Sequence, residues 1–162
     1  MTLASGADGG LAAAWFEGQR FYGSVLPVNE AELASTPTLR MAEQWLDAYF
    51  AGRSAMPPLP PLSPAGSPFR RAVWNLLLQI PPGETTTYGE IARQLRALGL
   101  RASAQAVGGA VAHNPISIII PCHRVWGAGG QVVGYAGGIE RKQLLIRHEI
   151  SHSMGNLLHP PF

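Results

Sequence analysis

The only cysteine of the chain, Cys122, stands beside His123 at the end of an apolar run, and these two residues are the best candidates in the sequence for a reactive site. A thiolate is a strong nucleophile, and a neighbouring histidine can accept the proton of a thiol. A single cysteine excludes an internal disulfide and any site built on several thiolates. The pair therefore indicates nucleophilic catalysis, although a lone cysteine taken by itself is more often a small buried hydrophobic residue.

Composition sets limits on the class of protein. The chain has 162 residues, of which 46% are hydrophobic, enough for one ordinary domain or two small ones. Its net charge of +2 permits contact with nucleic acid without predicting it. A free thiol suits a reducing compartment, and we find neither an export signal nor a run of about 18 apolar residues. We therefore expect a cytoplasmic protein without a membrane span.

The first part of the sequence has the pattern of β-structure. Two short apolar runs, residues 2–5 and 11–16, flank a turn composition at residues 6–10, which predicts an antiparallel hairpin. A further run at residues 21–26 is a candidate for another strand. We expect residues 1–53 to form a small N-terminal domain around this hairpin.

A helix and a proline-rich segment follow the hairpin. Thr36 is a good N-cap and Pro37 a good first helical residue, and apolar residues recur after them at helical spacing. Repeated prolines make residues 54–66 a stiff, extended linker. The linker leads to a second domain at residues 67–150, and we expect residues 151–162 to be a tail with little periodicity.

The second domain is predicted to be mainly helical. Its helices are expected after capping residues or prolines, and they end at turn-forming residues. We expect helices after Ser67-Pro68, from Tyr88 to about Ala97, from Ala104 to Ala112, and from about Glu140 to Glu149. The second and third of these are short and surround a tight turn, which suggests a helix-turn-helix.

Cys122 lies between a buried segment and a loop. Residues 116–120 are isoleucines interrupted only by a serine, and they predict a buried strand that leads to the thiol. Residues 127–138 are rich in glycine and predict a loop that can approach another group closely. The thiol would then lie at the end of a strand, a few residues before this loop.

Three motifs in this region resemble one protein family. They are Pro121-Cys122-His123-Arg124-Val125, Gly134-Tyr135-Ala136-Gly137-Gly138 and the run Leu-Leu-Ile-Arg-His-Glu at residues 144–149. Further matches lie upstream at residues 106–110, Asn114-Pro115, Ser67-Pro68-Phe69 and Val73-Trp74. The sequence resembles the O6-alkylguanine-DNA alkyltransferases, also called methylated-DNA–protein-cysteine methyltransferases. The resemblance is strong from about Ser67 to Glu149 and weak before it.

The resemblance implies a mixed α+β fold, with a small RNase H-like N-terminal domain that looks shortened at its start. It implies a helical C-terminal domain whose helix-turn-helix binds the minor groove of double-stranded DNA and flips out O6-alkylguanine. The activity implied is DNA repair by irreversible transfer of the alkyl group to Cys122, so that each molecule acts once. A monomer without a cofactor is expected.

The resemblance also assigns roles to five side chains. Cys122 is the acceptor, and His123 takes its proton, through a water molecule. Glu149 orients the imidazole, and Asn114 braces the turn before the predicted strand. Tyr88 donates a hydrogen bond to the leaving guanine, although its position alone would favour a packing role.

Further residues are assigned to the base and to DNA. Backbone groups of Cys122, Val125 and Ala136 are expected to read the base edge, with Tyr135 packed along the pocket. Contacts with DNA are expected from Ala104, Gln105, Ala106, Gly108 and Arg124. Gln105 stands where the family has the arginine that replaces the flipped nucleotide, so it gives up a cation and a planar stacking group.

Two other functions fit the residues. One is a non-catalytic sensor of alkylated DNA, in which Cys122 is a core residue and base flipping is impaired. The other is a thiol hydrolase that uses Cys122 and His123 on a small amide or ester. No metal site is expected, because the five histidines lack partner thiols and a recognisable ligand motif.

Overall fold

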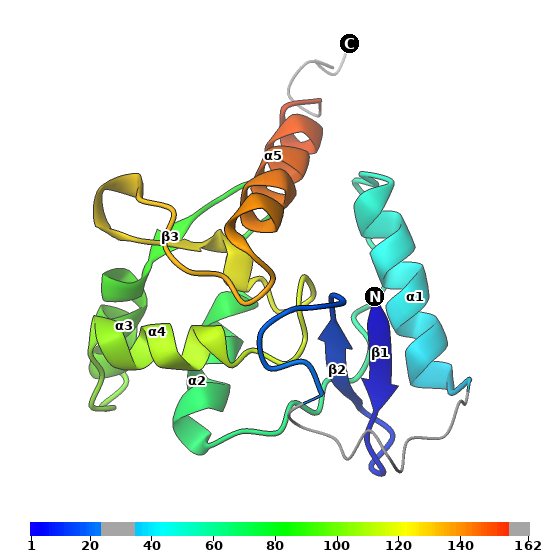
Figure 1. The fold of residues 1–162 in the computed structure, drawn as a ribbon, viewed down its shortest axis with the longest axis horizontal. Coiled ribbons are helices and arrows are strands. Elements are labelled where there is room, and N and C mark those ends of the chain that lie inside the picture. The colour runs from blue at the N-terminus through cyan, green and yellow to red at the C-terminus, as the bar shows by residue number, and fades with distance from the viewer. Residues whose placement is uncertain (24–34, 156–162) are drawn as a thin grey trace.

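The structure is a computed structural model that describes residues 1–23 and 35–155. The described residues form five α-helices and two small two-stranded sheets, a mixed α+β fold. Figure 1 shows the N-terminal hairpin and α1 on one side of the molecule, with α2, α3 and α4 on the other. The predicted α+β class is confirmed.

The predicted N-terminal hairpin is present. Strand β1 (Thr2–Ser5) pairs antiparallel with β2 (Leu11–Trp15), with an irregularity in register between Ala4 and Ser5. All residues of β2 are buried, because the strand also makes parallel bridges on its other side, from Leu11 to Leu62 and from Ala14 to Ile116. Residues 21–23 form a turn rather than a strand, and the rest of that predicted run lies outside the described residues.

Helix α1 (Pro37–Phe50) covers the hairpin. The Thr36 side chain accepts a hydrogen bond from the Leu39 N–H, so the predicted N-cap is confirmed. The helix turns an apolar face to the core, where Trp45 and Tyr49 are buried and their rings stack at 5.6 Å. This face places the Tyr49 hydroxyl toward the centre of the molecule.

The proline-rich segment is extended, as predicted, but it is held against the protein. Leu11 N–H donates to the Pro61 carbonyl, and Ser63 N–H donates to the Leu11 carbonyl. Gly66 lies against the Trp74 ring, where an added Cβ would come within 2.6 Å of the indole. The segment therefore connects the two parts of the chain along a fixed path.

The first three of the four helices predicted for the second domain are present as α2 (Pro68–Leu77), α3 (Tyr88–Ala97) and α4 (Ala104–Ala112). Each begins at a capping side chain that accepts a backbone N–H three residues later; the caps are Ser67, Thr87 and Ser103. Helix α4 packs against both α2 and α3, and the Trp74 indole donates to the Ala110 carbonyl at 3.0 Å. The Glu90 N–H donates to the Thr87 side chain, and the Glu90 carboxylate pairs with Arg93.

Residues 116–120 are buried, but the predicted strand is wrong. Only Ile116 makes a bridge, and residues 117–119 form a turn in which Ile118 has φ of 72°. The Ile120 N–H bonds to the Ile116 carbonyl and the Ser117 N–H bonds to the Ala14 carbonyl of β2, so these backbone groups are paired without a regular sheet ladder. The short strand before the glycine-rich loop comes later, where β4 (Val125–Trp126) pairs in parallel with β3 (Thr86–Thr87).

Helix α5 (Ile139–Gly155) is longer than predicted. It continues past residue 150 into the predicted tail, because no glycine or proline interrupts the sequence before Gly155. Ser151 and His152 also bond to the His148 carbonyl. Residues 156–162 of the predicted tail lie outside the described part. No described helix has the length and apolar character needed to cross a membrane.

Candidate active site

Cys122 lies in the interior, at the start of a short 3-10 helix, η2 (Cys122–Arg124). Its N–H donates to the Ile120 carbonyl at 2.8 Å, and its Sγ accepts a hydrogen bond from Asn114 Nδ2 at 3.0 Å. The turn at residues 117–119 and η2 together aim the sulfur back toward α4. The thiol is therefore held by the loop backbone on one side and by Asn114 on the other.

Asn114 is the residue that organises this loop. Its Nδ2 also donates to the carbonyls of Ile116 and Ile120, and its Oδ1 accepts the Ile116 N–H at 3.0 Å. These bonds replace the ladder that a strand would have made. The predicted bracing role of Asn114 thus has a geometric basis, with a direct contact to the nucleophile in addition.

His123 and Glu149 form a buried pair. The His123 side chain has no exposed surface, and its Nε2 lies 2.7 Å from Glu149 Oε1. Since the carboxylate accepts, Nε2 carries the proton and Nδ1 has the lone pair. Nδ1 has no hydrogen-bond partner within the described residues. The nitrogen that can act as a base is therefore the free one.

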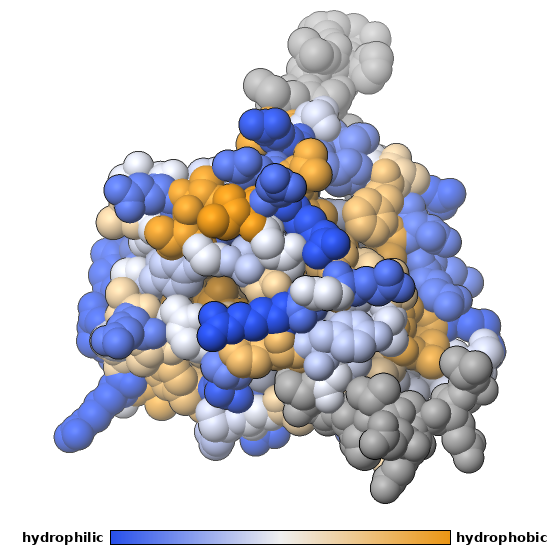
Figure 2. Space-filling model, viewed as in Figure 1, coloured by the Kyte–Doolittle hydropathy of each residue, from blue (hydrophilic) through white to orange (hydrophobic). Residues whose placement is uncertain are grey.

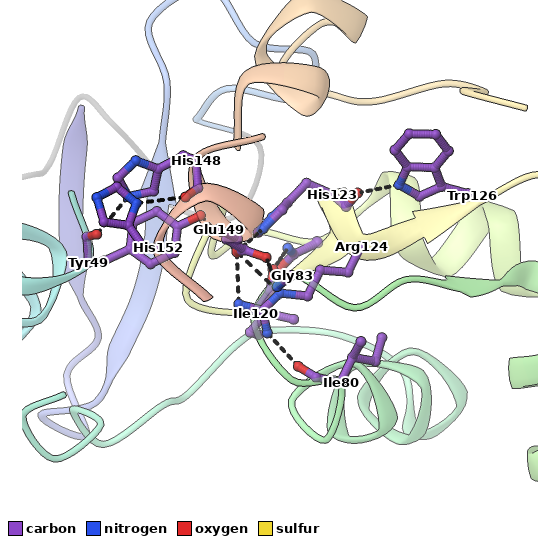
Figure 3. Close-up of polar contacts among 11 residues, drawn as sticks. Tyr49, Ile80, Gly83, Ile120, His123, Arg124, Trp126, His148, Glu149 and His152 are labelled. Carbon is purple, nitrogen blue, oxygen red and sulfur yellow. Dashed lines mark hydrogen bonds and ion pairs between the residues drawn. The ribbon is translucent and has the colours of Figure 1, made fainter. Parts of the chain in front are cut away.

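Glu149 is the centre of a polar network that sequence analysis did not foresee. Its Oε1 also accepts from the Tyr49 hydroxyl at 2.8 Å, and its Oε2 accepts from the Gly83 N–H at 2.9 Å. Figure 3 shows these partners converging on the carboxylate from separate parts of the chain. Burial acts to raise the pKa of Glu149, but the hydrogen bonds from His123 and Arg124 lower it below its ordinary value. The group is a carboxylate at neutral pH.

Arg124 belongs to this network, and its predicted contact with DNA is not supported by its position. The side chain is buried, with Nε 3.0 Å from Glu149 Oε2 and Nη2 2.9 Å from Glu149 Oε1. Its Nη1 donates to the Ile80 carbonyl. The guanidinium faces inward because it neutralises a buried carboxylate, and it is not available to a phosphate at the surface.

Burial favours the uncharged forms of the Cys122 thiol and the His123 imidazole. It raises the pKa of the Cys122 thiol, which the Asn114 hydrogen bond and the charge of Lys142 only partly oppose. It lowers the pKa of His123, against the effect of Glu149. The resting pair is thus a thiol and a neutral imidazole, and charge separates only when the proton moves.

Lys142 is a site residue that sequence analysis missed. It is fully buried and is the only lysine of the chain. Its Nζ donates to the Val133 carbonyl at 2.9 Å, and burial lowers its pKa to about 8 against the attraction of Cys122. A signal was available, because Lys142 shares a buried helical stripe with three inward-facing residues of α5, Leu145, Ile146 and Glu149.

A cavity of about 190 Å³ lies between α3, α4 and the glycine-rich loop. Its walls include four of the predicted residues, Tyr88, Gly108, Tyr135 and Ala136, together with Arg20, which was not predicted. The Tyr88 hydroxyl lies 3.5 Å from the Val133 carbonyl, and the buried Tyr135 hydroxyl has no partner of full hydrogen-bond geometry in the described residues. Cys122 does not line the cavity itself, but two wall residues, Tyr88 and Tyr135, both interact electrostatically with its thiol.

Val125 is buried and is not among the residues that line this cavity. Its N–H donates to the Cys122 carbonyl, so the N–H groups of Val125 and Cys122 are both used within the loop. Only carbonyl groups of these two residues are left to read a base edge. The Ala136 carbonyl accepts the Arg20 N–H at 2.9 Å.

The outer face of α4 consists of small or uncharged side chains. Ala104, Gln105 and Ala106 are exposed at its start, whereas Val107 is buried. A Cβ on Gly109 would meet nothing within 4 Å. The predicted DNA-contacting residues of this helix therefore lie together at the surface, beside the cavity mouth that Gly108 borders.

Residues 148–152, His-Glu-Ile-Ser-His, do have the His-Glu-x-x-His spacing of zinc hydrolases, contrary to the expectation of no ligand motif. In the structure, His148 Nε2 bonds to the Tyr49 carbonyl at 2.8 Å and His152 Nδ1 to the His148 carbonyl at 2.7 Å. Glu149 turns away from them to His123. The described residues contain no group of three His, Cys, Asp or Glu side chains placed to hold a metal ion. The His148 ring lies against the rings of Tyr49 and Phe50 of α1.

Comparison with known proteins agrees with the motifs. Residues 68–151, more than half of the chain, match the family described as the DNA-binding domain of 6-O-methylguanine DNA methyltransferase. The chain belongs to this family. The matched segment begins at the first residue of α2 and ends within α5, so it contains Asn114, Cys122 and Glu149. The family predicted from the sequence is confirmed.

Curated members of the methyltransferase family are close relatives. A methylated-DNA–protein-cysteine methyltransferase of Mycolicibacterium paratuberculosis is 50% identical over 116 residues, which are 72% of this chain and 68% of that protein. The protein of the same name from Shigella flexneri is 48% identical over 104 residues, covering 64% of this chain and 59% of its own length. The aligned part is thus about two thirds of these relatives.

Solved structures of methyltransferases share the fold. The crystal structure of Mycobacterium tuberculosis OGT in complex with DNA matches with a TM-score of 0.73 and 40% identity, over 93% of this chain and 86% of that one. The O6-methylguanine methyltransferase structure from the same organism matches with a TM-score of 0.72 and 41% identity, over 88% and 81%. The match therefore extends beyond the family segment into the N-terminal region.

Proposed function

We propose that this chain is a single-turnover DNA repair protein that transfers the alkyl group of O6-alkylguanine in double-stranded DNA to Cys122. The observation that carries the proposal is the environment of the thiol, which is held by Asn114, is next in sequence to a histidine whose free nitrogen is Nδ1, and interacts with Tyr88 and Tyr135 of the cavity wall. The names of the curated relatives support the same activity. The reaction needs no cofactor.

The first step is removal of the thiol proton. Glu149 fixes the proton of His123 on Nε2, so Nδ1 accepts the proton of Cys122, directly or through one water molecule. The imidazolium formed is stabilised by the buried carboxylate, which is why the network around Glu149 matters for rate. Lys142 favours the thiolate by its positive charge.

The second step is displacement at the alkyl carbon. The Cys122 sulfur forms a bond to this carbon while the bond from the carbon to guanine O6 breaks, and the electron pair passes to the guanine. Tyr88 donates a proton to the leaving base. Burial raises the pKa of Tyr88, so the hydroxyl remains a donor. The thioether has no easy hydrolytic exit, and each molecule therefore acts once.

The proposed DNA-binding element is the helix-turn-helix formed by α3, the turn and α4. Small residues at the exposed start of α4 fit a minor groove that is only about 6 Å wide. The space around Gly108 and Gly109 is open. A Cβ added to Gly108 would have its nearest neighbour among the described residues 3.8 Å away, and one added to Gly109 would have none within 4 Å. The space kept free there fits close approach by a partner. The flipped guanine would occupy the adjacent cavity.

The proposal also covers the N-terminal domain, the oligomeric state and the cellular location. The hairpin and α1 would be part of the RNase H-like N-terminal domain that the family resemblance implies. We propose that the protein acts as a monomer in the cytoplasm, where a free thiol persists.

Intact mass measurement tests the proposed function. Incubation with a duplex that contains O6-methylguanine should add one methyl group per molecule, and peptide mapping should place it on Cys122. The variant Cys122→Ser, which is nearly isosteric, should stay unmodified. An unmodified wild-type protein that still binds the duplex would favour the sensor, whereas repeated turnover of an acyl substrate would favour the hydrolase.

A further inference from the structure

The turn after β2 is fixed to the active-site loops. Gln19 is buried, and its Oε1 accepts from the Phe16 N–H at 2.9 Å and from the Ser117 hydroxyl at 3.0 Å. The next residue, Arg20, donates its N–H to the Ala136 carbonyl. In Figure 1 this turn lies beside the end of α4. The backbone of Arg20 is thus placed by contacts with the turn before Cys122 and with the glycine-rich loop.

The Arg20 side chain lies at the mouth of the cavity. Arg20 is exposed and lines the cavity with Tyr88 and Gly108. Its guanidinium carbon is 5.0 Å from the centre of the Phe21 ring, and that ring stacks on His113 at 4.3 Å. Phe21 has φ of 65°, which is uncommon for a bulky residue. The aromatic pair supports the guanidinium next to the C-terminal end of α4.

The charge of Arg20 is not neutralised within the described part of the protein. The ion pairs found there involve other residues, and none includes Arg20. Figure 2 shows hydrophilic surface across the centre of this face, in the area where the turn approaches α4. An exposed guanidinium without a carboxylate is well suited to bind an oxyanion in bidentate geometry.

Helix α4 cannot supply this charge. Its sequence, Ala-Gln-Ala-Val-Gly-Gly-Ala-Val-Ala, contains no charged residue. Binding of duplex DNA nevertheless depends mainly on neutralisation of phosphates by arginine and lysine. The phosphates next to the flipped nucleotide must remain at the cavity mouth while the base is inside. Arg20 is the cation that the described residues place on the rim of this cavity.

We propose that Arg20 binds a backbone phosphate beside the flipped nucleotide, so that the N-terminal region takes a direct part in DNA binding. This inference rests on the proposed function. It makes Arg20 a determinant of the preference for DNA over the free alkylated base, because the free base has no phosphate.

The test compares two substrates as a function of salt. Methyl transfer from an O6-methylguanine duplex and benzyl transfer from free O6-benzylguanine are measured for wild type, Arg20→Gln and Arg20→Met, the last of which keeps an apolar stem over Phe21. Both variants should react about tenfold more slowly with the duplex at low salt, and the slope of log rate against log salt should fall by about one. Rates with the free base should stay within about twofold of wild type.

Two further variants act as controls. Arg20→Lys keeps the charge and should keep most of the salt slope. Arg40→Gln makes the same charge change on α1, away from the cavity, and should change neither rate. All four variants are compared by thermal unfolding, and the exposed Arg20 side chain should be replaceable without a shift in midpoint.

The outcomes separate this inference from the proposed function. If wild type transfers an alkyl group from neither substrate, the proposed function fails. If wild type reacts but both Arg20 variants keep its duplex rate and salt slope, the inference is overturned alone. Equal losses with both substrates at an unchanged unfolding midpoint would also overturn it, because Arg20 would then shape the cavity rather than bind phosphate.

Discussion

Replacing Glu149 with glutamine is expected to weaken both the fold and the alkyl transfer. Five donor atoms converge on this carboxylate: the Tyr49 hydroxyl, the Gly83 N–H, His123 Nε2, and Nε and Nη2 of Arg124. A glutamine amide has one acceptor oxygen, so its NH₂ group would face donors that now bond to a carboxylate oxygen. The Arg124 guanidinium would also remain buried without a counter-charge.

The expected losses of stability and of rate in Glu149→Gln follow from this geometry. Removal of one partner from a buried ion pair costs about 3–5 kcal/mol of the free energy of unfolding. The loss in rate should be about 10²–10⁴-fold, the usual contribution of general-base catalysis, since His123 would lose the carboxylate that fixes its tautomer and stabilises the imidazolium. Tyr49→Phe is the matched control, because it removes one neutral donor and should cost only about 1 kcal/mol.

Two assays measure these effects. Urea unfolding gives the stability, and single-turnover methyl transfer from an O6-methylguanine duplex gives the rate. Since the pKa of Glu149 is lower in the folded state than the ordinary value of 4.5, the wild type should lose stability as the pH falls below about 4.5. The variant should lack this part of the pH dependence. A Glu149→Gln protein with wild-type stability and wild-type rate would refute the assignment of Glu149 as the positioning group.

Two other substitutions test the cavity and its surroundings. The wild-type free energy of unfolding should rise between about pH 8 and 10.5, because the folded state releases the Lys142 proton at the lower of these values, and Lys142→Met should remove this rise. Urea unfolding at several pH values measures the difference. Identical pH profiles would contradict the burial of the amine. Gln105→Arg should speed repair of duplex DNA by about tenfold and leave the reaction with free O6-benzylguanine unchanged, since a cation at the start of α4 acts only on DNA. Equal effects in the two rate assays would count against a base-flipping role for this position.

The sequence alone was sufficient to identify the candidate nucleophile and to predict most of the secondary structure. Caps at Thr36, Ser67 and Ser103 are local signals, because each side chain bonds to its own helix, and the helices that begin after them were predicted correctly. Cys122 and His123 were found because they are adjacent in the chain. Such features depend on contacts within a few residues, which a sequence pattern can represent.

Features that depend on distant contacts were missed or misread. The apolar run at residues 116–120 has the composition of a strand, but the Asn114 side chain takes its backbone groups and Ile118 adopts a left-handed conformation. Arg124, which lies two residues after Cys122 in the sequence, was predicted to contact DNA. In the structure it pairs with Glu149, which is 25 residues further along the chain. Arg20 reaches the cavity only because a turn of the N-terminal region docks on the glycine-rich loop.

The burial of the only lysine has a practical consequence for labelling. Amine-specific reagents such as succinimidyl esters should modify the folded chain at its α-amino group alone, since Lys142 is shielded and the other basic side chains are arginines and histidines. Reaction at Lys142 would require the helix and the loop that enclose it to separate. The rate of amine labelling at this one position, followed by mass spectrometry, therefore reports how often the interior beside the thiol opens to solvent.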